Sequence, residues 1–300
     1  MQKLNYFTVD VFTGERFQGA QIAVVPDAAG LSEQQMMKIA AEFNLWRSVF
    51  IVPSDKADKK IRVFNGKREF NFGGHPTLAA IYCLAKQNRL DLTDGDNQFS
   101  IEETHGLVKC KVKIENGEPV FNQFVVDANP EYDSFAPTEE ELASFLNTDA
   151  LKLLSPGFKP MLVATEIPYL IVPVDSLETL KQVRFSYDTW ASSTAPATCA
   201  NAILLFARAD DSCQADFHCR MVGPVFGMHE DPPVGAAMPA FSGYLSQFTD
   251  TPQQFVVERG VYQARYSYLH IDIQSVSSDK ITLSIGGQAV LSSQGSLFLD

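Results

Sequence analysis

The sequence predicts an α+β protein of two pseudo-symmetric, barrel-like halves, each a sheet wrapped around a buried central helix. Strand-like runs dominate the chain, and two helical runs, Thr77 to Ala85 and Val234 to Tyr244, have almost no polar face. A helix that is apolar all round is surrounded by protein, and strands on every side of it give a barrel-like sheet. The two helices begin about 150 residues apart, a spacing typical of one domain each.

The strand predictions rest on short runs rich in β-branched and aromatic residues. The pattern is clearest from Leu107 to Ile114, where apolar residues alternate with three lysines, as in a half-buried strand. The other predicted strands are Leu4 to Phe12, Ile22 to Pro26, Ser48 to Pro53, Ile61 to Phe64 and Ala215 to Val222.

Two further helices are predicted from capping boxes. Ser32 to Gln35 has this signature and is followed by apolar residues at helical spacing up to Phe43. Thr138 to Glu141 repeats the signature before Leu142 and Phe145.

The length of 300 residues suffices for two domains, each with its own core. The segment from Ala128 to Ala136 is polar and turn-rich, which favours a linker there. We expect an N-terminal half over residues 1–127, completed by the C-terminal strand at about 288–300, and a C-terminal half over residues 128–287.

The charge and the cysteine content of the chain indicate which partners and which cellular compartment to expect. The chain has 24 Lys and Arg against 36 Asp and Glu, a net charge of -12, which makes nucleic acid and anionic membranes poor partners. Its five cysteines are scattered, with no C-x-x-C pair, as in a reducing compartment. No run reads as a signal peptide or spans a bilayer, so the expected location is the cytoplasm.

The candidate chemistry lies at the starts of the two buried helices. His75 and Asp231 each come directly before proline, and each motif opens into small and apolar residues. Proline suits the first helical turn, and a helix N-terminus attracts carboxylate or phosphate. We therefore expect Gly74, Gly235 and Ala236 to begin paired helices whose N–H groups hold an anionic substrate between His75 and Asp231.

Other interpretations compete with this one. His75 could be a capping or core histidine, and Asp231 could be an ordinary N-cap. A metal site would collect His218, Cys219, His229 and Asp231, but their spacing matches no zinc signature, so no metal is expected. The chain has no G-x-S-x-G, Walker or G-x-G-x-x-G motif, which leaves hydrolase and nucleotide-binding functions unsupported.

With these motifs in order, the chain resembles the phenazine-biosynthesis isomerase-like family, relatives of diaminopimelate epimerase. The similarity runs nearly end to end. It is carried by Asp10 to Val25 (family D-x-F-T and F-G-G-N-P-x-A-V-V), Leu31 to Ala40 (L-S-x-x-x-M-x-x-I-A), Gly74 to Thr77 (G-H-P-T), Glu230 to Gly235 (E-D-P-x-x-G) and Gly287 to Val290 (G-x-A-V).

The resemblance implies two barrel-like halves with the active site in the cleft between them. Family members move a proton on a small carboxylated metabolite without metal or organic cofactor, and they often form homodimers. His75 and Asp231 would be the catalytic residues, with Gly74, Gly235 and Ala236 binding the substrate. Proton transfer needs a base and an acid within reach of one carbon.

The chain departs from the family pattern in three places, one of which is the opening, where Ala20 and Gln21 stand in place of the family N-P. Arg47 stands where the family has its acid/base glutamate in N-L-S-E-T-x-F, and Ala236 stands where the family has the serine of G-S-A. Arginine stays protonated and cannot act as a base. Two functions therefore remain open: an isomerase-type enzyme that relies on His75 and Asp231, and a catalytically inactive protein that binds a ligand or a partner.

Overall fold

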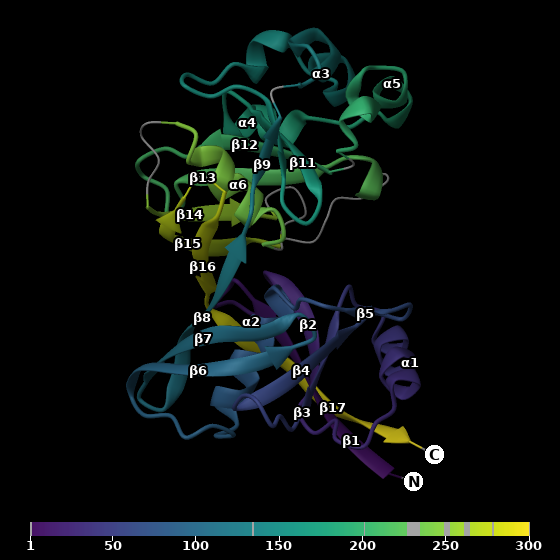
Figure 1. The fold of residues 1–300 in the computed structure, drawn as a ribbon, viewed down its shortest axis with the longest axis vertical. Coiled ribbons are helices and arrows are strands. Elements are labelled where there is room, and N and C mark those ends of the chain that lie inside the picture. Colours follow the sequence, from purple (N-terminus) through teal and green to yellow (C-terminus); the bar gives the residue numbers. More distant parts are fainter. Residues whose placement is uncertain are drawn as a thin grey trace. The chain divides into compact units, whose positions relative to one another are not determined.

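The computed structural model describes residues 2–133, 135–200, 202–226, 235–248, 253–260, 265–277 and 279–299. The chain divides into two compact units, of which unit 1 contains Met1–Val125 and Ile285–Asp300, and unit 2 contains Val126–Ser284. Strands β8 (Glu118–Ala128) and β16 (Ile281–Gly287) contain the two boundaries, so the chain leaves unit 1 in β8 and returns to it in β16 (Figure 1).

Unit 1 contains two helices and most of its strands in one continuous stretch of chain. The elements are β1 (Gln2–Val11), β2 (Ala20–Val25), α1 (Glu33–Phe43), β3 (Ser48–Val52), β4 (Lys59–Phe64), β5 (Glu69–Phe70), α2 (His75–Lys86), β6 (Gly95–Glu103) and β7 (Gly106–Glu115), completed by β17 (Ala289–Leu299) from the C-terminal end.

Unit 2 has more helices than unit 1 in the part of the chain that the structure describes. Its elements are β9 (Glu131–Asp133), α3 (Glu139–Leu146), β10 (Met161–Ala164), β11 (Pro168–Pro173), α4 (Leu177–Gln182), α5 (Tyr187–Ala191), β12 (Ala202–Arg208), β13 (Phe217–Val222), α6 (Met238–Leu245), β14 (Gln254–Arg259) and β15 (Ser267–Val276).

The two units repeat one order of strand pairing. In unit 1, β1–β2, β3–β4 and β6–β7 pair antiparallel, whereas β2–β3 and β4–β6 pair parallel. In unit 2, β10–β11, β12–β13 and β14–β15 pair antiparallel, whereas β11–β12 and β13–β14 pair parallel. Strand β17 pairs with β1 as β9 pairs with β10. The duplication predicted from the buried helices is therefore confirmed in the strand topology.

Helix α2 lies inside the sheet of unit 1. Every residue from Pro76 to Ala85 is buried, and the helix contacts β1, β2, β3, β4, β7 and β17 (Figure 1). A helix enclosed on all sides needs no polar face, which explains its apolar sequence. Helix α6 is likewise buried in unit 2 and contacts β10 and β11.

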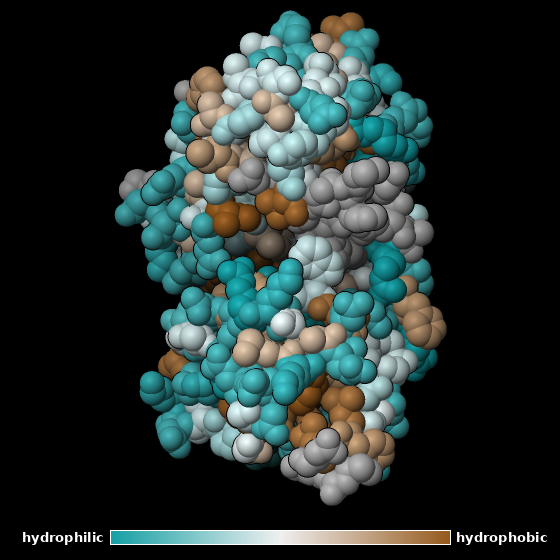
Figure 2. All heavy atoms as spheres, turned by 90° about the vertical axis from the view of Figure 1, so that its right-hand side faces the viewer, coloured by the Kyte–Doolittle hydropathy of each residue, from teal (hydrophilic) through white to brown (hydrophobic). Residues whose placement is uncertain are grey.

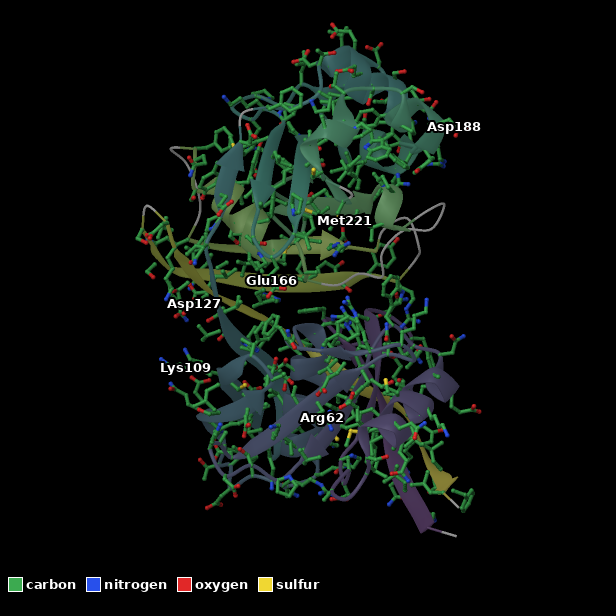
Figure 3. The ribbon with its side chains drawn as sticks, turned by 45° about the vertical axis from the view of Figure 1, so that its right-hand side comes forward. Arg62, Lys109, Asp127, Glu166, Asp188 and Met221 are labelled. Atoms are coloured by element: carbon green, nitrogen blue, oxygen red, sulfur yellow. The ribbon has the colours of Figure 1, made fainter. Side chains whose placement is uncertain are left out.

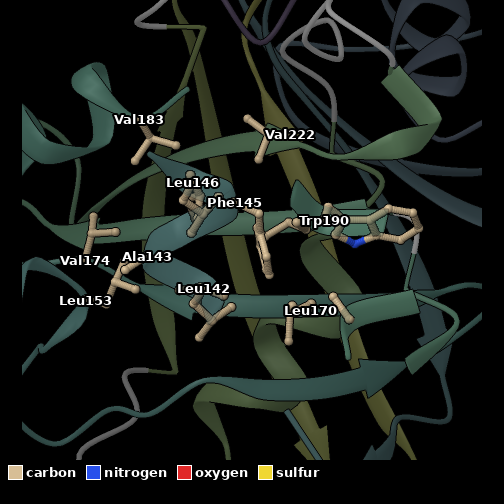
Figure 4. Close-up of a cluster of buried hydrophobic side chains, with 14 of the residues drawn as sticks. Leu142, Ala143, Phe145, Leu146, Leu153, Leu170, Val174, Val183, Trp190 and Val222 are labelled. Atoms are coloured by element: carbon tan, nitrogen blue, oxygen red, sulfur yellow. The ribbon is translucent and has the colours of Figure 1, made fainter. Parts of the chain in front are cut away.

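The predicted capping boxes are both present, and both helices pack on the outside of a sheet. Helix α1 starts after Ser32 and buries Met36, Ile39 and Ala40 against β3 and β4. Helix α3 starts after Thr138 and packs its apolar face into a cluster with α4, α5 and the sheet, which includes Phe145 and Trp190 (Figure 4).

Two expectations about local structure were wrong. The second buried helix was expected to begin at Val234, but α6 begins at Met238, with Pro239 in its first turn. The expected linker contains a strand, because residues Glu131–Asp133 pair with Leu162–Ala164 of β10. Its polar side chains are exposed, as they are in a strand at a sheet edge.

The surface is largely hydrophilic on the face drawn in Figure 2, with apolar side chains in small groups. The lysines of β7 lie on its solvent side, and Lys109 projects outward from the sheet (Figure 3). None of the helices in the described part of the chain combines the length and apolar composition that a bilayer crossing requires. None of the five cysteines forms a disulfide.

Candidate active site

The motif Gly73 to Thr77 forms a tight loop and the first turn of α2. Gly74 is the N-cap and has φ 64° and ψ -119°, a conformation that favours glycine. Gly73 is buried, and a Cβ there would lie 2.4 Å from Thr77 Oγ1, so no larger residue fits without movement. Pro76 occupies the first turn, where its missing N–H has no helical partner.

His75 is the first residue of α2 and is half-buried. The Thr77 N–H donates to the carbonyl oxygen of Gly74 at 2.9 Å, which closes the first turn around His75. The backbone of this residue is therefore held by a glycine with a special conformation on one side and a proline on the other. A fixed backbone is what an acid/base side chain needs for repeated proton transfer in one geometry.

Arg47 directly precedes β3 and contacts the segment that leads to His75. Its Cζ lies 3.3 Å from the centroid of the Phe70 ring, and the Cζ of Arg68 lies 4.6 Å from the same centroid. Phe70 belongs to β5, which pairs with β4 opposite Val63. Two cations therefore contact one aromatic ring five residues before His75.

The strand that carries Phe70 is fixed by a bidentate ion pair. Arg62 of β4 donates to both carboxylate oxygens of Glu69, at 2.7 and 2.6 Å, and to Glu33 of α1 at 3.1 Å. Such fork-to-fork pairs set orientation as well as adding energy. They hold β5, and with it Phe70 and Arg47, in a defined place on the sheet.

One buried group of this region was missed from the sequence. Glu103, the last residue of β6, is 3% exposed and accepts the Gly73 N–H and the Thr77 hydroxyl, each at 2.6 Å. The alternation of β6 contains the signal, because Glu103 shares a strand face with buried Ile101. A carboxylate therefore accepts the N–H group of Gly73, the residue directly before Gly74, whose own N–H group was expected to bind an anionic substrate.

The predicted site residues of the second motif are described only in part. Asp231 lies outside the described residues. Gly235 is buried and Ala236 is exposed, and both precede α6 instead of starting it. The Met238 N–H donates to the carbonyl oxygen of Gly235 at 3.0 Å. Gly235 and Ala236 belong to unit 2, whereas Arg47, Gly74 and His75 belong to unit 1.

Among the described residues, no group of three His, Cys, Asp or Glu side chains could hold a metal ion. His218, considered as a ligand from the sequence, instead lies with Nδ1 2.5 Å from Glu258 Oε2 on the neighbouring strand. Tyr268 donates to the other oxygen of Glu258 at 2.9 Å. This row of side chains runs across three adjacent strands of unit 2.

Comparison with known proteins gives consistent matches over the whole chain. Residues 9–295 match the model of the family described as phenazine biosynthesis-like protein. An uncharacterized isomerase of Mesorhizobium japonicum is 32% identical, with 100% of both chains covered. A trans-2,3-dihydro-3-hydroxyanthranilate isomerase of Pseudomonas aeruginosa is 26% identical over 98% of this chain and 99% of that protein.

Solved structures show the same fold. A phenazine biosynthesis protein of the PhzF family from Bacillus anthracis has a TM-score of 0.85, 24% identity and coverage of 100% of both chains. A probable proline racemase of Agrobacterium radiobacter has a TM-score of 0.63 and 11% identity, with 99% of this chain and 93% of that chain covered.

Proposed function

Because this chain belongs to the phenazine biosynthesis-like protein family and has its α+β epimerase-like fold, we propose that it is an isomerase that transfers a proton on a small carboxylated metabolite. Relatives that align over the full chain are named isomerases. We expect the proton-transfer residues to differ from those of the family, because Arg47 is expected at the position of the family glutamate.

The position of His75 at the start of α2 is the main observation in favour of this function. The loop and helix start hold its backbone rigidly, and imidazole is the side chain best suited to give and take protons near neutral pH. Asp231, in the matching sequence motif, is proposed as the second acid/base residue. Gly74, Gly235 and Ala236 would bind the substrate through the backbone.

Arg47 sets the expected chemistry apart from that of the family. A guanidinium cannot remove a proton, but it binds carboxylates in a bidentate manner. We therefore expect Arg47 to hold a carboxylate of the metabolite and His75 to supply the proton transfer, at a rate below that of relatives with a glutamate. No cofactor enters this scheme, and a homodimer remains an expectation.

The second function is a ligand-binding protein without catalysis. Arg47 favours it, since a cation is expected at the position of the family's glutamate base. Both functions require binding of a small carboxylate, so both predict thermal stabilisation by such a ligand. Ligand at a hundredfold excess over Kd stabilises a protein by about 2.7 kcal/mol.

A thermal-stability screen with small mono- and dicarboxylic acids tests this common requirement. We expect a dicarboxylate to raise the melting temperature of the wild-type protein and to lose this effect in Arg47→Gln. Arg68→Gln serves as the matched control, since Arg68 contacts the same ring but is exposed. Equal stabilisation of wild type and Arg47→Gln would contradict the assigned role of Arg47.

A further inference from the structure

The chain topology brings the end of β6 to the start of α2. The last residues of β6 pair with the first residues of β4, Ile101 with Lys59 and Glu102 with Lys60. Strand β5 runs back antiparallel to β4, so the chain reaches the start of α2 near the carboxyl end of β6. Glu103 ends β6 and faces inward. Its neighbour Glu102 faces the other way and binds Lys60 at 2.8 Å and Ser54 at 2.5 Å.

The carboxylate of Glu103 joins the loop to the helix. One oxygen, Oε2, accepts the backbone N–H of Gly73, and the other, Oε1, accepts the hydroxyl of Thr77, both at 2.6 Å. Both bonds are short and charge-assisted, and both are buried. His75 lies between these two anchored residues in the sequence, so the carboxylate fixes the chain on both sides of it.

His105, in the turn between β6 and β7, braces the same loop. Its Nδ1 lies 3.6 Å from Glu103 Oε2 and 3.1 Å from the carbonyl oxygen of Asn71, and its backbone N–H donates to that carbonyl at 3.2 Å. The ring of His105 packs edge-on against Phe72, with 5.0 Å between centroids. Each residue from Asn71 to Gly73 is thus held by the end of β6 or the turn after it.

The surroundings of Glu103 have opposing effects on the pKa of its carboxyl group. Burial raises the pKa of its carboxyl above the ordinary value, whereas the Thr77 hydroxyl, the Gly73 N–H and His105 lower it. The nearby thiol of Cys110 on β7 is neutral, because burial and then the charge of Glu103 raise its pKa. A backbone N–H can only donate, so the bond to Gly73 favours the ionised carboxylate.

We propose that Glu103 is the positioning residue of His75, fixing its loop through Gly73 and Thr77 and placing a negative charge beneath the start of α2. This inference rests on the proposed function in one respect, since His75 must be the acid/base group for its position to matter. The charge stabilises a protonated imidazole at His75.

NMR on the full-length protein without ligand tests this proposal independently of any activity. The backbone amide of Gly73 and the ring resonances of His75 are followed through a pH titration of wild type, Glu103→Gln and Glu102→Gln. The chain has only five histidines, and His75 is assigned as the signal lost in His75→Asn. Glu102→Gln removes a neighbouring carboxylate from the opposite face of the same strand, so it is the matched control.

In Glu103→Gln, the Gly73 amide proton should move upfield and the titration midpoint of His75 should fall. Glu102→Gln should leave both signals unchanged. Thr77→Val removes the hydroxyl bond to Glu103 and keeps the carboxylate. It should shift the amide resonances of Gly73 and Gly74, and it replaces Glu103→Gln in the test if that variant does not fold. An unchanged His75 midpoint in Glu103→Gln, or an equal change in Glu102→Gln, overturns the proposal.

Discussion

The guanidinium of Arg47 lies over the ring of Phe70, with 3.3 Å between Cζ and the ring centroid. This contact fixes a cation beside Phe70, on the segment that leads to His75. Phe70 itself belongs to a strand held by the Arg62–Glu69 ion pair. The guanidinium of Arg47 is therefore held in place by its neighbours, and its effect on ligand binding can be measured by substitution.

Phe70→Leu should weaken carboxylate binding, because Arg47 loses the ring that orients it. Cation–π contacts contribute about 0.5–2 kcal/mol, which corresponds to about a 2- to 30-fold rise in Kd. Calorimetry on wild type, Phe70→Leu, Arg47→Gln and the double variant measures the coupling. If Phe70 acts through Arg47, Phe70→Leu has no further effect in the Arg47→Gln background. Additive losses would refute this link.

Gly73→Ala should destabilise the protein and impair ligand binding together. Its Cβ would lie 2.4 Å from Thr77 Oγ1 and 3.0 Å from Glu103 Oε1, which forces the loop to move. Overpacking of this kind costs about 1–3 kcal/mol. Gly117→Ala is the control, since that glycine has φ 75° but open space around it. It should lower the free energy of unfolding without changing Kd, and an unchanged Kd in Gly73→Ala would count against the site.

The adjacent residues Glu102 and Glu103 should give opposite pH dependences of stability. Burial raises the pKa of Glu103 in the folded protein, so the unfolded chain loses its proton first as the pH rises above the ordinary value of 4.5. The stability of wild type relative to Glu103→Gln should therefore fall as the pH rises from 4.5 through the raised pKa of the folded protein.

The hydrogen bond from Lys60 lowers the pKa of Glu102, which reverses the sign. The stability of wild type relative to Glu102→Gln should therefore fall as the pH drops below 4.5 and through the lowered folded pKa. Urea unfolding at a series of pH values gives both differences. Parallel slopes for the two variants would show that the two carboxyl groups do not have the environments described.

Two arginines, one buried and one exposed, donate hydrogen bonds to carbonyl groups at the end of α4. Their substitution compares the stability contributed by a buried and an exposed donor. Arg220 is 8% exposed and donates through Nη1 to the carbonyl oxygens of Leu180 at 2.6 Å and Val183 at 2.9 Å. The exposed Arg184 donates to the same region, including Val183 at 2.8 Å. Arg220→Met removes the buried donor to the carbonyl oxygen of Leu180, whereas Val183 keeps its bond to Arg184, and the loss costs about 1–3 kcal/mol. Arg184→Met should cost less in urea unfolding, because water replaces its bonds.

The sequence predicts the enclosed helix and the helix starts, but it does not predict the hydrogen bonds that hold the loop before His75. The apolar run from Thr77 to Ala85 predicts an enclosed helix, because no soluble protein exposes such a surface, and α2 is enclosed. The capping boxes at Ser32 and Thr138 fix helix starts through local hydrogen bonds. Such signals are contained within a few residues, so one sequence reveals them.

What the sequence did not reveal depends on contacts between distant residues. Glu103 meets Gly73 across 30 positions, and nothing at either position alone indicates the bond. The start of α6 was misplaced because Gly235 and Ala236 are compatible with a turn as well as a helix, and the turn is closed by the bond between Met238 and Gly235. The contact of Arg47 with Phe70 likewise follows from strand pairing.

Solvent deuterium incorporation tests the central claim most directly, that His75 transfers the proton and Arg47 replaces the family base. The probe is trans-2,3-dihydro-3-hydroxyanthranilate, the compound in the name of the Pseudomonas aeruginosa relative. Wild type should exchange slowly, His75→Asn should not exchange, and Arg47→Glu should exchange about 100- to 10,000-fold faster than wild type. Arg47→Gln is the control, because it removes the cation without supplying a base. Rapid exchange by wild type, or equal rates for Arg47→Glu and Arg47→Gln, would contradict the account.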